Sequence, residues 1–210
     1  MQPATDPSAA PALDEAAPGA ATRKRPRPGE RRVQILQVLA QMLEQPGAER
    51  VTTAALAARL EVSEAALYRH FASKAQMFEG LIDFIESTVF GLINQISERE
   101  ADGRARAARI VAMVLQFGEK NPGMTRVMVG DALVFEHERL QQRMNQFFDR
   151  IESTLRQCLR ATTAASSTPT VDAQVAANVL TAFVVGRLQG YARSGFRRLP
   201  TEHLEASLAL

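Results

Sequence analysis

The sequence predicts an all-α protein of about nine helices. Apolar residues recur at the spacing of one helix face along most of the chain, and no convincing run of alternating strand residues or hairpin turn is found. The chain has 210 residues, of which 46% are hydrophobic, so it can bury a sizeable core. We therefore expect one compact helical fold or two small helical domains.

The N-terminal segment differs from the rest in composition. Residues 1–28 are dominated by Pro and Ala and hold almost no large apolar side chains, which predicts a flexible tail. Basic residues crowd ten positions at its end, opposed by Glu30 alone: Arg23, Lys24, Arg25, Arg27, Arg31 and Arg32. Such an arm can neutralise DNA phosphates, although a solvated tail explains it equally well. The formal net charge of only +2 does not decide between the two.

The helical patterns follow one another along the whole remaining chain. Pro46-Gly47 ends the first of them, and a small-polar linker at 161–170 separates the last long ones. The expected helices cover residues 33–43, 52–60, 63–71, 73–96, 104–120, 124–135, 140–159, about 171–190, and a last one from about 201.

Two of these helix starts carry specific capping signals. Ser73 and Gln76 form a capping box, in which Ser73 bonds the backbone at Gln76 and the Gln76 side chain reaches back. Asn121-Pro122 supplies an N-cap followed by proline at the first helical position, where the missing N–H has no cost.

Residues 53–71 have the layout of a helix-turn-helix. A short apolar-faced helix is followed by the three-residue connection Glu61-Val62-Ser63 and by another short helix. Leu67 anchors the second helix inward, and Ser63 satisfies the free N–H groups at its start. The sequence therefore predicts a DNA-binding unit from Thr52 to Lys74.

This unit resembles the signature of the TetR-type regulator family. The matching residues are Thr52-Thr53, Ala57, Val62-Ser63, Leu67-Tyr68-Arg69-His70-Phe71 and Ser73-Lys74. Within the family, the chain is most similar to the branch of nucleoid occlusion factors, through residues 62–71, 84–86, 117–123 and 140–146. The resemblance spans roughly residues 31–200.

The resemblance implies a domain organisation. An N-terminal three-helix DNA-binding domain with the helix-turn-helix would span 29–75, after the tail at 1–28. A C-terminal helical dimerisation and partner-binding domain would span 76–210.

We expect the DNA-binding unit to contact DNA in two ways. Residues at the helix starts, on the exposed side of the second helix and in the basic arm would contact phosphates: Thr52, Thr53, Tyr68, His70, Lys74, Arg31 and Arg32. Residues at and along the groove-entering part of the recognition helix are candidates for base contacts: Ser63 as its cap, Glu64, Ala65, Ala66 and Arg69. Arg69 to guanine is the favoured polar contact, although its place near the helix end also suits a phosphate. Outside this motif, His70 would be interpreted as a core or capping residue and Tyr68 as half-buried packing.

Glu61 departs from the family pattern. The family usually has a glycine at this point of the turn, where a positive φ is favoured, and a non-glycine residue costs on the order of 1 kcal/mol there. We therefore expect a slightly strained or differently shaped turn.

The resemblance also implies partners. The protein would form a homodimer through its last two long helices, with Gly186 and Gly190 allowing close approach, and would bind palindromic DNA; packing within one chain is the alternative for the glycines. In the nucleoid occlusion branch the DNA-bound protein contacts the division protein FtsZ through the fourth and fifth helices. Phe84, Lys120 and Asn121 match that pattern, Leu92, Met113 and Gln116 lie in the same region, and Leu92 is apolar where the branch tends to be basic. Without the resemblance, Phe84 is equally well interpreted as core.

A ligand-responsive TetR-type transcriptional repressor is the alternative function. Six side chains could line an effector cavity, although such residues more often form core: Met113, Phe117, Met124, Met128, Phe147 and Phe148. An enzyme finds little support, because His70, His137 and His203 are scattered without a nucleophile, metal-ligand spacing or phosphate-binding glycine loop. Asp83 with Glu86, and Glu136 with Glu138, are interpreted as solvated helix faces. No cofactor and no metal site are expected.

A cytoplasmic, nucleoid-associated location fits the remaining features. The lone Cys158 permits no internal disulfide, the N-terminus lacks the basic start and apolar core of a secretory signal, and no uninterrupted apolar stretch is long enough for a membrane span.

Overall fold

The computed structural model describes residues 29–45, 50–160, 162 and 169–209. These residues form nine α-helices and one 3-10 helix, without a strand among them, which confirms the predicted fold class. The elements are α1 (Glu30–Leu43), α2 (Thr53–Arg59), α3 (Glu64–Tyr68), α4 (Lys74–Arg99), α5 (Gly103–Lys120), α6 (Pro122–Met128), η1 (Asp131–Leu133), α7 (Glu138–Arg160), α8 (Pro169–Arg193) and α9 (Leu204–Leu208). The predicted tail at 1–28, with the basic residues Arg23 to Arg27, lies outside the described residues, as does most of the linker at 161–170.

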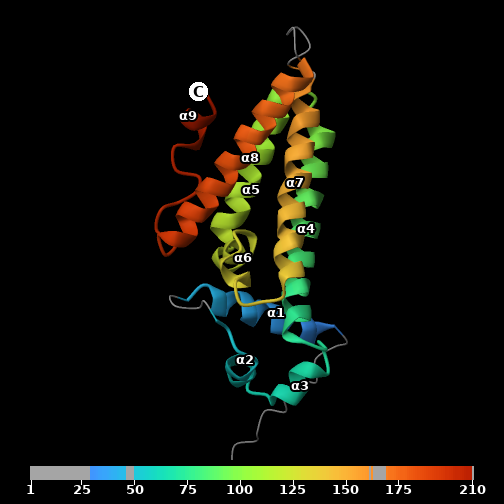
Figure 1. Cartoon of the computed structure of the whole chain (residues 1–210), viewed down its shortest axis with the longest axis vertical. Helices are drawn as coiled ribbons and strands as arrows, with labels where there is room; N and C mark the ends of the chain where they lie inside the picture. The colour runs from blue at the N-terminus through green and yellow to red at the C-terminus, as the bar shows by residue number, and fades with distance from the viewer. Residues whose placement is uncertain (1–28, 46–49, 161, 163–168, 210) are drawn as a thin grey trace, which may run out of the picture.

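The helices form a tall bundle with a smaller group of helices at one end. Figure 1 shows α4, α5, α7 and α8 as the long helices of the bundle, with α1, α2 and α3 below them. α7 packs against α8, α5 contacts both, and α4 contacts α1, α5 and α7. The helix-turn-helix thus lies at the end of a rigid support.

A single hydrophobic core joins the two parts. Its buried members run from Leu39 of α1 through Phe78 of α4 to Leu155 of α7. At the junction α1 approaches α4 closely, because a Cβ at Gly80 would lie 3.0 Å from a methyl carbon of Leu36. α4 begins directly after the helix-turn-helix and continues as one helix into the bundle.

α6 is shorter than the sequence predicts. The expected helix at 124–135 ends at Met128 in the structure, and a 3-10 turn follows at Asp131–Leu133. Gly130 has a φ of 87°, a left-handed conformation that glycine adopts without strain and that ends the helix. The apolar spacing continues past this glycine, so periodicity alone overestimated the helix.

Two capping predictions need correction in detail. Ser73 caps α4 as expected, with its hydroxyl accepting the Gln76 N–H at 3.2 Å, but the Gln76 side chain accepts the N–H of Ala72 rather than that of Ser73. Asn121 precedes Pro122 at the start of α6 but makes no side-chain cap there. Its amide donates instead to the Phe117 carbonyl at 2.7 Å, which satisfies the end of α5.

α8 presents an apolar stripe that is not covered by any described residue. Val171, Val175 and Val179 are each 56% to 60% exposed at four-residue spacing. A side chain at Gly186 or Gly190 would begin in open space. By length and composition alone, α8 is also apolar enough to cross a membrane, although its apolar residues do not form one uninterrupted stretch. Its other face packs against α5 and α7 inside the bundle.

Candidate nucleic-acid interface

The two helices of the helix-turn-helix are capped by the predicted residues. The Thr52 hydroxyl accepts the Ala55 N–H at 3.1 Å, and the Ser63 hydroxyl accepts the Ala66 N–H at 3.3 Å. Each cap satisfies one of the backbone donors that a helix start leaves free. Leu56 and Leu67 are buried and fix the two helices on the core.

The turn between α2 and α3 has the predicted unusual backbone. Glu61 has a φ of 54°, in the left-handed region that favours glycine. Two backbone bonds hold it there, from the Glu61 N–H to Ala58 O at 3.1 Å and from the Val62 N–H to Ala57 O at 3.0 Å. The chain thus keeps the turn geometry of a glycine with a charged residue in its place.

The recognition helix α3 is a single short helix whose outer side is open. Glu64, Ala65, Tyr68 and Arg69 are exposed, while Ala66 and His70 are half-buried. α3 ends at Tyr68, so Arg69 is its C-cap and His70 lies beyond it. The helix predicted over residues 63–71 is therefore too long, and Phe71 is buried in the core after the helix has ended.

Glu64 is held by the first helix of the motif. The Thr53 hydroxyl donates to a Glu64 carboxylate oxygen at 2.6 Å. Two residues predicted to contact DNA separately therefore form one unit across the turn. This bond ties the start of α2 to the start of α3.

Of the two arginines of the basic arm that the structure describes, Arg31 is half-buried and Arg32, although exposed, contacts residues beyond its own helix. Its guanidinium donates to the His70 carbonyl and lies 4.1 Å from the centroid of the Phe71 ring. Arg31 donates to the Gln34 side chain at 2.7 Å on the same helix. Arg32 thus fastens α1 to the chain that follows α3.

Lys74 also has a partner within the protein. At the first position of α4, its ammonium forms an ion pair with Glu136, which lies between η1 and α7. The prediction that Glu136 lies on a solvated face is wrong, because its side chain is only 10% exposed. No local pattern could have indicated the pair, because the two residues are 62 positions apart.

The residues predicted to bind a protein partner lie on α4 and α5, except Asn121, which directly follows α5. Phe84 is 47% exposed, which is unusual for a large apolar side chain, and Gln116 and Lys120 are exposed on α5. Leu92, Met113 and Asn121 are half-buried, and Asn121 is engaged with Phe117. α4 packs against α5, so these residues lie on or next to two neighbouring helices.

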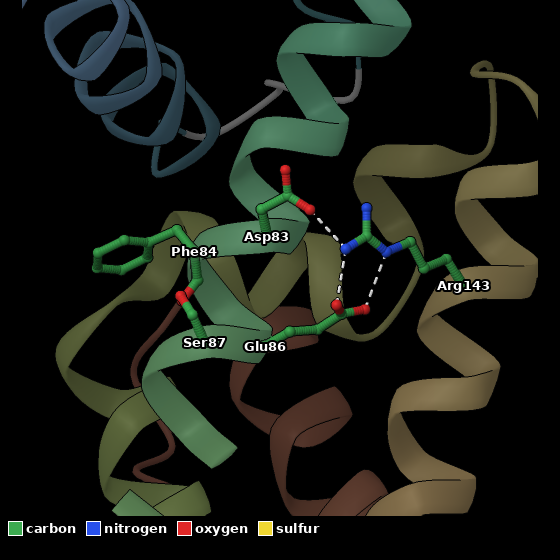
Figure 2. A network of polar contacts seen from close by, with 5 residues as sticks. All are labelled: Asp83, Phe84, Glu86, Ser87 and Arg143. Carbon is green, nitrogen blue, oxygen red and sulfur yellow. Dashed lines mark hydrogen bonds and ion pairs between the residues drawn. The ribbon is translucent and has the colours of Figure 1, made fainter. Parts of the chain in front are cut away.

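An ionic clamp holds α4 on the side away from Phe84. Figure 2 shows Arg143 of α7 reaching Asp83 and Glu86, while Phe84 points to the opposite side of α4. The three hydrogen bonds are between 2.5 and 3.0 Å long. The hydrogen bonds that Arg143 donates to Glu86 raise the pKa of Arg143 most, and partial burial opposes them. Glu86 is therefore an ion-pair partner rather than a solvated residue as predicted.

The residues considered for an effector cavity belong to the core. Phe117, Met128 and Phe147 are buried, and Met113, Met124 and Phe148 pack partly buried against the same cluster. The Phe147 ring makes edge contacts with Phe90 and Phe148 at centroid distances of 5.5 and 5.1 Å. Among the described residues, these six side chains belong to the packed core or pack against it, and do not form the lining of a cavity.

A helix-turn-helix carried at one end of a helical bundle defines a class of DNA-binding regulator. Solved structures of that class share the fold. A fatty acid degradation regulator FadR from Bacillus halodurans aligns with a TM-score of 0.69 at 14% identity, over 87% of this chain and 94% of that one. The TetR family regulator PfmR from Thermus thermophilus aligns with a TM-score of 0.65 at 23% identity, over 84% and 92%.

Sequence comparison identifies the branch. Residues 35–81 match the family of bacterial regulatory proteins called tetR, and residues 102–210 match the SlmA-like, tetracycline repressor-like C-terminal domain. The chain is 51% identical over 177 residues to the nucleoid occlusion factor SlmA of Idiomarina loihiensis, covering 84% of this chain and 90% of the relative. It is 50% identical over 194 residues to SlmA of Vibrio atlanticus, covering 91% and 96%. The chain therefore belongs to the SlmA family of nucleoid occlusion factors, a DNA-binding branch of the TetR regulators and not a family of enzymes.

Proposed function

We propose that this protein binds palindromic chromosomal sites as a homodimer and, when bound, inhibits the assembly of the FtsZ ring over the nucleoid. The observation that carries the proposal is the combination of about 50% identity to SlmA proteins with an exposed Phe84 on the surface of α4 and α5. The location would accordingly be cytoplasmic and nucleoid-associated.

The exposed stripe of α8 supports the dimer. Val171, Val175 and Val179 project from one face, and the glycines further along it leave room for a neighbouring backbone. Burying such a stripe against a second copy removes apolar surface from water, and a two-fold dimer carries two recognition helices about 34 Å apart. That spacing suits two half-sites of a palindrome on successive major grooves.

On DNA, we assign separate tasks to the exposed residues of the motif. Tyr68, His70, Lys74, the N-cap Thr52 and Thr53 at the start of α2 would contact phosphates, as would Arg31 and Arg32 of α1. Ser63 begins the helix that enters the groove, where Glu64, Ala65, Ala66 and Arg69 are candidates for base contacts. The bond from Thr53 to Glu64 would fix the angle at which this helix enters.

The partner surface would be the exposed face of α4 and α5. Phe84 offers an apolar anchor, and Lys120 a positive charge, with Leu92, Met113, Gln116 and Asn121 around them. Exposed aromatic side chains are common centres of protein interfaces. Arg143 braces this turn of α4 from behind, so that Phe84 is presented on a fixed helix.

The test is FtsZ polymerisation in the presence of the DNA-bound protein. We expect saturating protein with its palindromic DNA to reduce sedimentable FtsZ polymers and Phe84→Ala to remove this effect while DNA binding is retained. Phe135→Ala is the matched control, because Phe135 is 66% exposed and lies on the connection to α7 rather than on α4 or α5. Normal FtsZ assembly with the DNA-bound wild type would overturn the proposal.

A further inference from the structure

The ion pair between Lys74 and Glu136 links the DNA-binding end to a distant segment. Lys74 begins α4 directly after the helix-turn-helix, and Glu136 lies in the connection between η1 and α7. The Lys74 side chain is 25% exposed and the Glu136 side chain only 10%. The lysine is thus accessible from solvent, whereas the carboxylate that holds it is largely covered.

Among the described residues, Lys74 is the cation paired with Glu136, because the nearby arginines have other partners. Its neighbour on α7, Arg139, is paired with Glu79 of α4 at 2.8 Å, and Arg143 is taken by Asp83 and Glu86. The Lys74 ammonium also lies 5.6 Å from the centroid of the Phe78 ring, which favours a cation at this place. Removing the lysine would leave a largely buried carboxylate without its counter-ion, which is costly.

We propose that Glu136 acts on DNA binding through Lys74. Its carboxylate competes with DNA phosphates for the Lys74 ammonium and thereby lowers the affinity for all DNA sequences. This inference rests on the proposed phosphate contact of Lys74. A lysine ammonium is a single compact charge, so a strong contact with a phosphate requires it to leave the carboxylate. Part of the phosphate attraction is then spent on breaking the ion pair.

The same competition acts in the opposite direction. By linkage, two free energies are equal: the one by which Glu136 weakens DNA binding, and the one by which bound DNA weakens the ion pair between Lys74 and Glu136. The Glu136 N–H donates to the Leu133 carbonyl at 3.0 Å, which closes the turn after η1. DNA binding would therefore increase the opening of this turn, beside the exposed Val134 and Phe135.

The first experiment compares Glu136→Gln with Glu138→Gln on sheared genomic DNA. Both changes remove one negative charge, but Glu138 is exposed and its carboxylate accepts a hydrogen bond from Gln142, so it controls for net charge. We expect E136Q to bind DNA about five-fold more tightly than E138Q.

Thermal stability distinguishes competition from a purely structural role. If Glu136 only supported the fold, E136Q would lower the unfolding temperature and weaken DNA binding together. Competition predicts that the unfolding temperature falls while DNA affinity rises. Equal or weaker binding by E136Q relative to E138Q would overturn the proposal.

Lys74→Gln separates this inference from the proposed function. We expect K74Q to weaken DNA binding and to abolish the difference between E136Q and E138Q when combined with each. If K74Q weakens binding but E136Q has no effect, the competition fails and the phosphate contact stands. If the wild type binds DNA but K74Q leaves its affinity unchanged, the phosphate contact itself fails, and the competition fails with it.

Hydrogen exchange on the wild type needs no variant. We expect the Glu136 amide to exchange faster in the DNA complex than in the free protein. Unchanged or slower exchange on binding would contradict the linkage, even if E136Q proved too unstable to measure.

Discussion

The guanidinium of Arg32 lies over the ring of Phe71, with 4.1 Å between the guanidinium carbon and the ring centroid, and donates a hydrogen bond to the carbonyl of His70. α1 is thereby attached to the segment that ends the recognition helix. Because Phe71 is buried, the arginine covers the edge of the core as well as satisfying a backbone acceptor. Arg32 is thus a structural residue of the motif before any DNA is bound.

Arg32→Ala should lower the free energy of unfolding by about 1 to 2 kcal/mol, since it removes a charge-assisted hydrogen bond and a cation–π contact. Arg31→Ala is the matched control. Arg31 pairs only with Gln34 among the contacts seen in the described residues, so its loss should cost less than about 0.5 kcal/mol. Urea unfolding of the two variants checks the difference, and equal effects would show that Arg32 does not fasten α1.

Glu61→Gly should stabilise the protein by about 1 kcal/mol. The φ of 54° at Glu61 is strained for a side chain with a Cβ and free of strain for glycine. Ala58→Gly, at an exposed position within α2, should instead destabilise by about 1 kcal/mol, because helices disfavour glycine relative to alanine. Urea unfolding measures both, and a loss of stability in E61G would mean that the Glu61 side chain contributes more than its backbone costs.

Most of the fold could be predicted because the responsible signals are local. Caps such as Thr52 and Ser63, and apolar spacing along α7, act within a few residues and survive any tertiary arrangement. The end of α6 could not be predicted, because the apolar pattern continues through Gly130 and only its backbone conformation stops the helix.

The functional residues were predictable in identity more than in arrangement. The resemblance gave the position of Lys74 and the basic run that of Arg32, but their partners Glu136 and His70 come from elsewhere in the chain. Arg143 and its clamp on α4 were missed entirely, because Asp83 and Glu86 lie about 60 positions away from it. Such pairs are set by the packing of α4 on α7, which spacing along the sequence does not encode.

Gly123→Ala should destabilise the protein by about 3 kcal/mol or more. A Cβ at this position would lie 2.0 Å from the carbonyl oxygen of Ala40, so α6 and α1 would have to separate. Gly91→Ala is the control, because Gly91 is exposed on α4 with no atom within 4 Å of the added carbon, and alanine in a helix interior should stabilise by about 0.5 to 1 kcal/mol. Similar unfolding free energies for the two variants would contradict the close approach.

Tyr191 should make the stability of the protein fall at alkaline pH. Burial raises the pKa of its phenol, and the nearby charges of Glu119 and Glu44 raise it further. In the unfolded chain the phenol ionises at about pH 10, so above that pH the unfolded state releases a proton that the folded state retains. The contribution is fully present below about pH 10 and is lost as the pH rises through the higher folded pKa.

The measurement is the free energy of unfolding of wild type and Tyr191→Phe between about pH 8 and about pH 11. At the lower pH, Y191F should be less stable by about 1 kcal/mol, because the phenol donates a hydrogen bond to the Glu119 carbonyl at 3.0 Å. With rising pH the two curves should converge, since only the wild type loses the contribution of the neutral phenol. Tyr68→Phe, the same change at the exposed tyrosine of α3, should keep the decline of the wild type. Parallel curves for wild type and Y191F would show that the fold does not hold the phenol in its neutral form.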